Sequence, residues 1–199
     1  MNKYIWLSIL LLGCNQSPDL NTDTPYPIPD NAIIREYDHI PDLYFASFQP
    51  EDGIVEEGDV LEGLRHGIWT RYFKTGKVEV ISAYHLGLKN GPQIQFDDSG
   101  YIISKSNFEN DLLEGDYRIY HRGQILERRT YRDGEMNGLF QKYYRDGTIM
   151  EESYYKDGVM HGTGKWYDAE GKLAIQYEYE NGELVGGFNA QEADSTVTE

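Results

Sequence analysis

The sequence of 199 residues has few of the residues on which several classes of protein depend. Cysteine occurs once, at Cys14, which excludes a disulfide-stabilised scaffold and a zinc site built from several thiolates. Basic residues are scarce: 18 Lys and Arg stand against 34 Asp and Glu, so the formal net charge is −16. Nucleic-acid binding needs clustered Lys and Arg that displace counterions from phosphates, so we expect no nucleic-acid partner.

Motifs for catalysis and for metal binding are also missing. The chain has no Walker pattern, no Gly-x-Ser-x-Gly motif and no pair of His at the spacing of metal ligands. The segment Asp97-Asp98-Ser99-Gly100 has the composition of a calcium loop, but the EF-hand spacing and its closing Glu are absent, so we interpret it as a turn. We therefore expect no enzymatic activity, no metal and no cofactor, although the plentiful carboxylates leave a glycosidase open.

The longest apolar run, from Tyr4 to Leu12, is shorter than the roughly 20 residues of a transmembrane helix and follows the basic Lys3, as in a secretory signal. Residues Leu11-Leu12-Gly13-Cys14 resemble the lipobox of bacterial lipoproteins. This resemblance implies cleavage before Cys14, diacylation of its sulfur and anchoring of the mature chain in a membrane of the bacterial cell envelope. The residue directly after the cysteine is Asn15 rather than Asp, which is similar to the pattern of lipoproteins that are released to the outer membrane. The alternative is an ordinary apolar N-terminus with an incidental cysteine.

The charge is uneven along the chain and suggests the domain organisation. Residues 15–62 contain 12 acidic residues and one basic residue, whereas residues 63–187 contain 19 acidic and 16 basic residues. We expect a signal peptide over 1–13, an acidic, proline-containing tether over 14–42, a folded array over 43–187 and an acidic disordered tail over 188–199. The acidic flanks favour solvation and repulsion from an anionic surface.

Glycine and aromatic residues recur with a period of 23 or 24 residues, which is typical of a repeat architecture. One glycine series is Gly67, Gly91, Gly115, Gly138, Gly162 and Gly186, and a second is Gly76, Gly100, Gly123, Gly147 and Gly171. Two aromatic series keep the same phase: Tyr72, Phe96, Tyr120, Tyr143, Tyr167, and Tyr84, Phe108, Tyr131, Tyr155, Tyr179. We expect five repeats over 67–187, with residues 43–66 as a degenerate cap.

Each unit predicts a β-hairpin. In residues 138–162, Asp146-Gly147 separates two short runs rich in aromatic and β-branched residues, which is a strong hairpin signal. No window shows helical periodicity. The third copy has one residue fewer at His121-Arg122-Gly123, which predicts a shorter turn. The fold class is therefore all-β, with tandem hairpins paired into an elongated single-layer antiparallel meander.

These units resemble the MORN repeat in its bacterial variant, through Gly67-Ile68-Trp69-Thr70-Arg71-Tyr72 with Gly76, and through Gly138, Tyr143 to Gly147, Tyr155 to Gly158 and Gly162. The resemblance covers residues 63–187. It implies an interaction scaffold, and bacterial proteins that resemble this chain are often described as antitoxin-like or immunity proteins.

A single-layer sheet has two faces and cannot bury both, so aromatics on its more variable face are candidates for a partner surface. The alternative is that they cover neighbouring side chains. The candidates are Trp69, Phe73, Tyr117, Ile119, Phe140, Tyr144 and Trp166. We expect a lipid-anchored, non-catalytic scaffold that binds a protein. The second hypothesis is a module that binds cell-wall glycan such as peptidoglycan, with Trp69 and Trp166 as sugar platforms.

Overall fold

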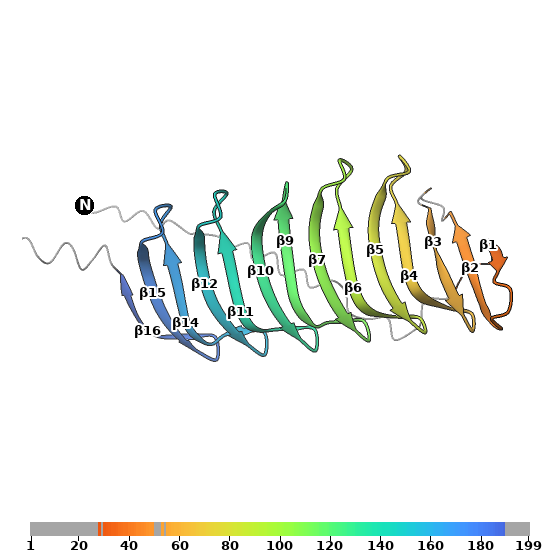
Figure 1. Cartoon of the computed structure of the whole chain (residues 1–199). Coiled ribbons are helices and arrows are strands. Elements are labelled where there is room, and N and C mark those ends of the chain that lie inside the picture. Colours follow the sequence, from red (N-terminus) through yellow and green to blue (C-terminus); the bar gives the residue numbers. More distant parts are fainter. Residues whose placement is uncertain (1–27, 29, 50–52, 54, 190–199) are drawn as a thin grey trace, which may run out of the picture.

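A computed structural model describes residues 28, 30–49, 53 and 55–189, and in this part of the chain 16 strands form one sheet without a helix (Figure 1). The strands are β1 Ile33–Glu36, β2 Leu43–Phe48, β3 Glu56–Leu61, β4 Leu64–Tyr72, β5 Val78–His85, β6 Leu88–Phe96, β7 Ile102–Glu109, β8 Leu112–Leu113, β9 Gly115–His121, β10 Gln124–Arg132, β11 Glu135–Tyr143, β12 Ile149–Lys156, β13 Val159–Met160, β14 Gly162–Tyr167, β15 Leu173–Glu180 and β16 Glu183–Asn189. The predicted signal peptide over 1–13 and Cys14 lie outside the described residues, as do residues 15–27 and 29 of the predicted tether and residues 190–199 of the predicted tail.

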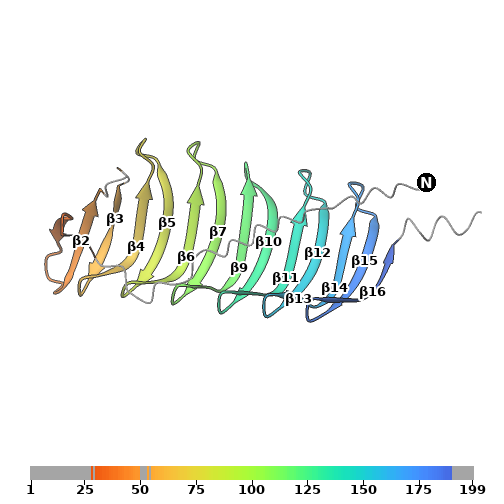
Figure 2. The ribbon, with the colours of Figure 1, turned by 180° about the vertical axis from the view of Figure 1, so that it is seen from behind.

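The strands follow one another across the sheet in chain order, each antiparallel to its neighbour, and the same single layer is seen from both sides (Figures 1 and 2). The two-residue strands β8 and β13 pair only with β7 and β12. The predicted all-β meander of hairpins is confirmed. The sheet begins at Ile33, inside the range expected to be tether, because Ile33 to Glu36 pair with Tyr44 to Ser47 of β2.

Two kinds of turn alternate along the array. At one end, a two-residue turn has both residues at positive φ, as at Asp157 (49°) and Gly158 (79°), which is the geometry of a tight hairpin. At the other end the turn is longer, and Tyr144 donates its backbone N–H to Thr148 O at 2.8 Å. The third copy has the predicted shorter turn, because Gln124 pairs directly with His121 and leaves a turn of two residues.

The first glycine series marks bulges in the register. Ser82 pairs with Gln93 while Tyr84 pairs with Lys89, so β6 contains two more residues than β5 over this stretch. Gly91 lies in this bulge with a φ of 109°, a backbone conformation that residues with a Cβ rarely adopt. Bulges change the simple alternation of faces along a strand, and this matters for the site.

Burial is confined to one face. The buried side chains all lie on the face of Trp69, which we call the Trp69 face; they are Ala46, Phe48, Val60, Trp69, Tyr84, Ser82, Gln93, Ser104, Ser106 and Ser153. The strands are bent along their length (Figures 1 and 2). Side chains crowd on the concave side of a bent sheet, so one-sided burial identifies the Trp69 face as the concave side.

The apolar core lies at the N-terminal end of the sheet. Ala46, Phe48, Val60, Trp69 and Tyr84 form one cluster, against which Ile28, Ala32 and Tyr44 pack. The segment before β2 thus closes the first hairpins, as a terminal cap does in a repeat protein. No helix of the described residues is long and apolar enough to cross a membrane.

Candidate functional site

The structure divides the seven candidate surface residues into two groups. Trp69, Tyr117, Ile119, Phe140 and Trp166 lie on the Trp69 face, as the strand register shows. Phe73 and Tyr144 lie beyond the ends of β4 and β11, in the longer turns. Trp69 is only 3% exposed and its Nε1 donates to Asp59 O at 2.7 Å, so its ring belongs to the core in this structure.

An aromatic row occupies the C-terminal part of the Trp69 face. We define the aromatic row as Tyr117, Tyr131, Phe140, Tyr155, Trp166, Tyr177 and Tyr179, all partly buried. In successive hairpins an outgoing-strand ring meets a return-strand ring: Tyr117 with Tyr131 at 5.9 Å, Phe140 with Tyr155 at 6.0 Å and Trp166 with Tyr177 at 5.7 Å between centroids. These tilted contacts are the favoured geometry of aromatic pairs. The rings therefore pack on one another and still present area to solvent.

Burial changes the ionisation of two tyrosines of this row, Tyr117 and Tyr155. Desolvation is the largest cause that raises the pKa of Tyr117 and of Tyr155 above the ordinary value, and Glu127 raises both further while Arg129 opposes the shift. Arg129 itself forms an ion pair with Glu127 at 2.6 Å on the same face. Tyr117 and Tyr155 therefore stay neutral at physiological pH and present hydroxyl groups rather than phenolates.

Three glycines make room for aromatic rings on this face, and sequence reasoning gave them no such role. A Cβ on Gly58 would lie 2.6 Å from Trp69 Cγ, and one on Gly164 would lie 2.7 Å from Trp166 Cη2. A Cβ on Gly187 would clash still more closely with the ring of Tyr177. None of these glycines has a positive φ, so their small size matters rather than their backbone freedom. The signal in the sequence was a glycine at a strand position outside the turns.

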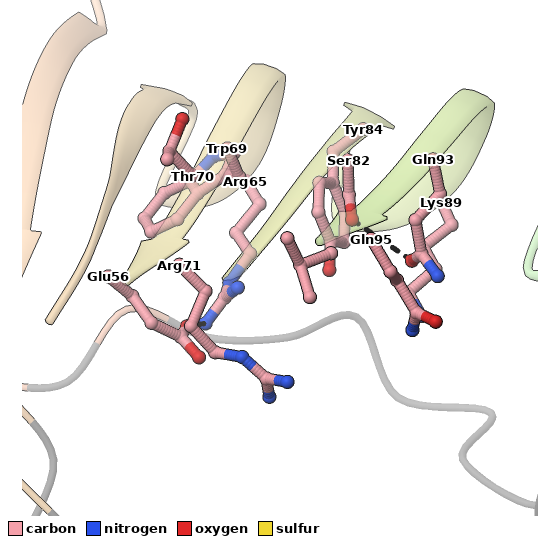
Figure 3. A pocket seen from close by; sticks show the side chains of 11 residues that line it. Glu56, Arg65, Trp69, Thr70, Arg71, Ser82, Tyr84, Lys89, Gln93 and Gln95 are labelled. Atoms are coloured by element: carbon pink, nitrogen blue, oxygen red, sulfur yellow. Dashed lines mark hydrogen bonds and ion pairs between the residues drawn. The ribbon is translucent and has the colours of Figure 1, made fainter. Parts of the chain in front are cut away.

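A polar pocket of about 130 Å³ opens on the N-terminal part of the Trp69 face, across β3 to β6 (Figure 3). On one side lie two ion pairs: Glu56 with Arg65 at 2.6 Å and Arg71 with Glu79 at 3.0 Å. The Arg65 guanidinium also lies 4.3 Å from the Trp69 ring centroid, a cation–π distance. The first pair is well buried, with side chains 13% and 17% exposed, so this side of the pocket is rigidly held.

The other side of the pocket consists of donors from β6: Lys89, Gln93 and Gln95 (Figure 3). Each glutamine is fixed through its Oε1, which accepts from Ser82 Oγ at 3.0 Å for Gln93 and from Ser104 Oγ at 2.7 Å for Gln95. Within the described residues neither Nε2 donates to another group, so both amide donors remain available. Sequence reasoning missed this set, because polar residues in a strand normally indicate a solvated face.

Lys89 is the third cation of the pocket, and the Asp111 carboxylate accepts from its backbone N–H at 2.7 Å rather than from its ammonium. In the described part of the chain it forms no ion pair, and its Nζ lies 4.9 Å from the Phe108 ring centroid. Burial lowers the pKa of Lys89 below its ordinary value; Asp111 opposes this, while Arg71 and Arg65 lower the pKa further. When Glu79 is counted with the residues that line it, the pocket has a net formal charge of about +1 within a strongly acidic protein.

The opposite face has a different cluster of charge. Lys105, Arg118 and Arg128 lie directly opposite one another on three neighbouring strands. Asp116 accepts from both arginines, at 2.5 Å from Arg118 and 3.2 Å from Arg128, and these side chains are more than a third exposed. On the same face the rings of His66 and His85 come within 5.3 Å, a proximity that their sequence separation did not indicate. Among the described residues no group of three or more His, Cys, Asp or Glu could hold a metal ion.

No match was found among curated proteins. Among solved structures, a mutant of TarM from S. aureus in complex with Fondaparinux, alpha-GlcNAc-glycerol and UDP is similar with 15% identity and a TM-score of 0.35. The likeness covers 50% of this chain and 19% of that one. The family model described as "MORN repeat variant" matches residues 65–85, 136–157 and 160–183.

Each matched stretch corresponds to part of the array described above. Residues 65–85 contain most of β4 and β5, residues 136–157 contain most of β11 and β12, and residues 160–183 contain β14 and β15. The resemblance inferred from glycine and aromatic spacing is therefore confirmed at these three stretches. At these three stretches the match to the MORN repeat variant falls on β-hairpins that belong to one open sheet within the described residues.

Proposed function

We propose that the protein is a non-catalytic scaffold that binds a protein partner on its Trp69 face, while a lipid on Cys14 holds it in the bacterial cell envelope. The observation that carries this proposal is the aromatic row, which stays partly exposed across strands β9 to β15. Aromatic side chains are enriched at the centres of protein interfaces, because they bury a large apolar area at a small cost in conformational entropy.

The alternative partner is a glycan of the cell wall, because aromatic rings also stack on sugars. Burial of Trp69 argues against the two-platform version of this hypothesis, since a sugar could not reach that ring without opening the core. Trp166 remains accessible in part and lies beside Tyr177. An antitoxin-like or immunity role is a finer version of the protein-binding proposal, and the identity of the partner would decide it.

The experiment is affinity capture of the full-length, C-terminally tagged protein from crosslinked native membranes, with identification by mass spectrometry. Phe140→Ala and Trp166→Ala remove rings of the aromatic row, and Tyr154→Ala removes a ring that is 47% exposed on the opposite face. Truncation of an aromatic hot spot at the centre of an interface costs about 2 kcal/mol of binding or more, which is roughly thirtyfold in affinity.

We expect one near-stoichiometric protein that is retained by Tyr154→Ala and lost in both row variants, with circular dichroism unchanged for all three. Loss of the partner in the Tyr154 variant alone would place binding on the other face and contradict the proposal. If only background proteins are captured while the protein is retained on purified peptidoglycan, the glycan hypothesis takes its place.

A further inference from the structure

The pocket between β3 and β6 has the chemistry of an anion site. Its neutral donors, Gln93 Nε2 and Gln95 Nε2, lie on the same side as the Lys89 ammonium (Figure 3). Of the carboxylates that line it or lie beside it, Glu56 and Glu79 are engaged by Arg65 and Arg71, and Asp111 accepts from the backbone N–H of Lys89. A ligand in this space therefore meets donors and positive charge, and it gains most if it brings acceptors and negative charge.

We propose that this pocket binds one carboxylate group, and that in the assembled complex this group is an acidic side chain of the partner protein. The first half stands on the geometry of the pocket alone, and only the source of the carboxylate rests on the proposed function. One carboxylate neutralises the excess charge of the pocket, and its two oxygens can accept from Lys89 and from a glutamine amide at the same time.

The volume of the pocket suits a small anion, and charge distinguishes a carboxylate from a phosphate. The pocket volume of about 130 Å³ accommodates a few non-hydrogen atoms, such as a carboxylate with its neighbouring methylene. A phosphate monoester carries a charge of about −1.5 to −2 at neutral pH, which would leave negative charge in excess beside Glu56 and Glu79. The same two carboxylates thus select against the more highly charged anion.

The acidity of the whole chain does not prevent such binding. At physiological ionic strength the screening length is about 8 Å, so exposed charges of the acidic flanks act weakly on a group in the pocket. Contacts inside the pocket are shorter and lie partly out of water, where each charge-assisted hydrogen bond is stronger. The net charge of the protein would slow the approach of an acidic partner, whereas the pocket would determine the lifetime of the contact.

The test is a titration of the full chain with sodium acetate, with sodium chloride at equal ionic strength as the reference, followed by the NMR signal of the Lys89 side chain. Lys89→Met identifies the signal by its disappearance. We expect a saturable shift with half-saturation in the millimolar range, on the order of 1–50 mM, as befits a ligand of four non-hydrogen atoms. Anion binding must also raise the pKa of Lys89, because it favours the charged form.

Two variants separate the pocket from general surface charge. Gln95→Leu keeps the volume but removes one donor, and we expect it to weaken acetate binding at least about threefold. Lys105→Met removes a cation from the opposite face and should leave the titration unchanged. An equal shift with chloride, or tighter binding of phosphate than of acetate, would overturn the assignment.

A second probe distinguishes the two sources of a carboxylate. N-acetylated, C-amidated glutamate presents the side-chain carboxylate as a protein does, and we expect it to bind at least as well as acetate. If acetate binds while the blocked glutamate does not, the pocket takes a small free acid and the partner's side chain is ruled out. Neither titration contains the partner, so failure here is distinct from failure to capture a partner on the aromatic row.

Discussion

Gly58→Ala tests the packing on which the N-terminal core depends. The new methyl group would lie 2.6 Å from Trp69 Cγ and 2.7 Å from the carbonyl oxygen of Ile68, both far inside normal contact distance. The ring cannot simply move away, because the Arg65 guanidinium lies 4.3 Å from the ring centroid and the Phe48 ring packs against it at 6.0 Å. Gly58 has no positive φ, so the substitution tests steric fit alone.

The cost can be worked out from these contacts. Inserting a methyl group into a filled core costs about 1–3 kcal/mol. Displacing the indole weakens the 2.7 Å hydrogen bond from Trp69 Nε1 to Asp59 O, which contributes about 0.5–1.5 kcal/mol. Alanine restricts the unfolded chain more than glycine does, which returns about 0.4–1 kcal/mol. We therefore expect the free energy of unfolding to fall by about 2 kcal/mol.

The assay is urea unfolding followed by tryptophan fluorescence, with Gly186→Ala as the matched control. Gly186 also lies in a strand without a positive φ, but its added Cβ would be 4.0 Å from the nearest atom, Glu178 Cβ. The control should therefore change stability by no more than about 1 kcal/mol, through the restricted unfolded chain. If the two variants unfold at the same urea concentration, Trp69 is not confined as described and the reasoning fails.

Three further predictions concern charge, pH and membrane attachment. Glu56→Gln removes the carboxylate to which Arg65 donates at 2.6 Å, and because this pair is well buried we expect a loss of about 2 kcal/mol in urea unfolding, with no loss contradicting its structural role. The raised pKa values of Tyr117 and Tyr155 mean that the unfolded chain releases these protons first, so stability should hold below pH 10 and fall as the pH rises above it. Urea midpoints measured across this pH range should show the fall in stability. The double variant Tyr117→Phe/Tyr155→Phe should make the fall shallower, and an equally steep fall in that variant would refute the assignment. Cys14→Ser should release the protein from the membrane fraction on sedimentation, and a variant that still sediments with membranes would refute lipid anchoring.

The period and the hairpins could be predicted because both depend on local chemistry. A turn such as Asp157-Gly158 needs residues that tolerate positive φ, and the chain provides Asn, Asp or Gly at most of these positions, with Leu86 as an exception. The shorter turn at Arg122-Gly123 followed from counting residues alone. In a meander each strand pairs with its sequence neighbours, so correct turns are enough to define the order of the sheet.

The composition of each face could be predicted only in part, because bulges interrupt the alternation of side chains. Arg71 pairs with Val80 while Tyr72 pairs with Val78, so Glu79 is an extra residue of β5 and joins Arg71 in an ion pair. Burial of Trp69 likewise depends on a glycine in another strand, Gly58. Such facts follow from register across strands, which one sequence does not contain.

On the Trp69 face, the side chains differ from repeat to repeat although the hairpin structure does not. Equivalent positions in the five repeats carry Trp69, Gln93, Tyr117, Phe140 and Gly164, yet the hairpins that hold them are alike. The face therefore changes from a donor-lined pocket near β6 to an aromatic row that ends near β15. Six strand spacings separate β6 from β14, or about 29 Å at 4.8 Å each. A partner that engaged both ends would need an acidic group and an apolar patch at this separation, which is a more selective requirement than either site alone.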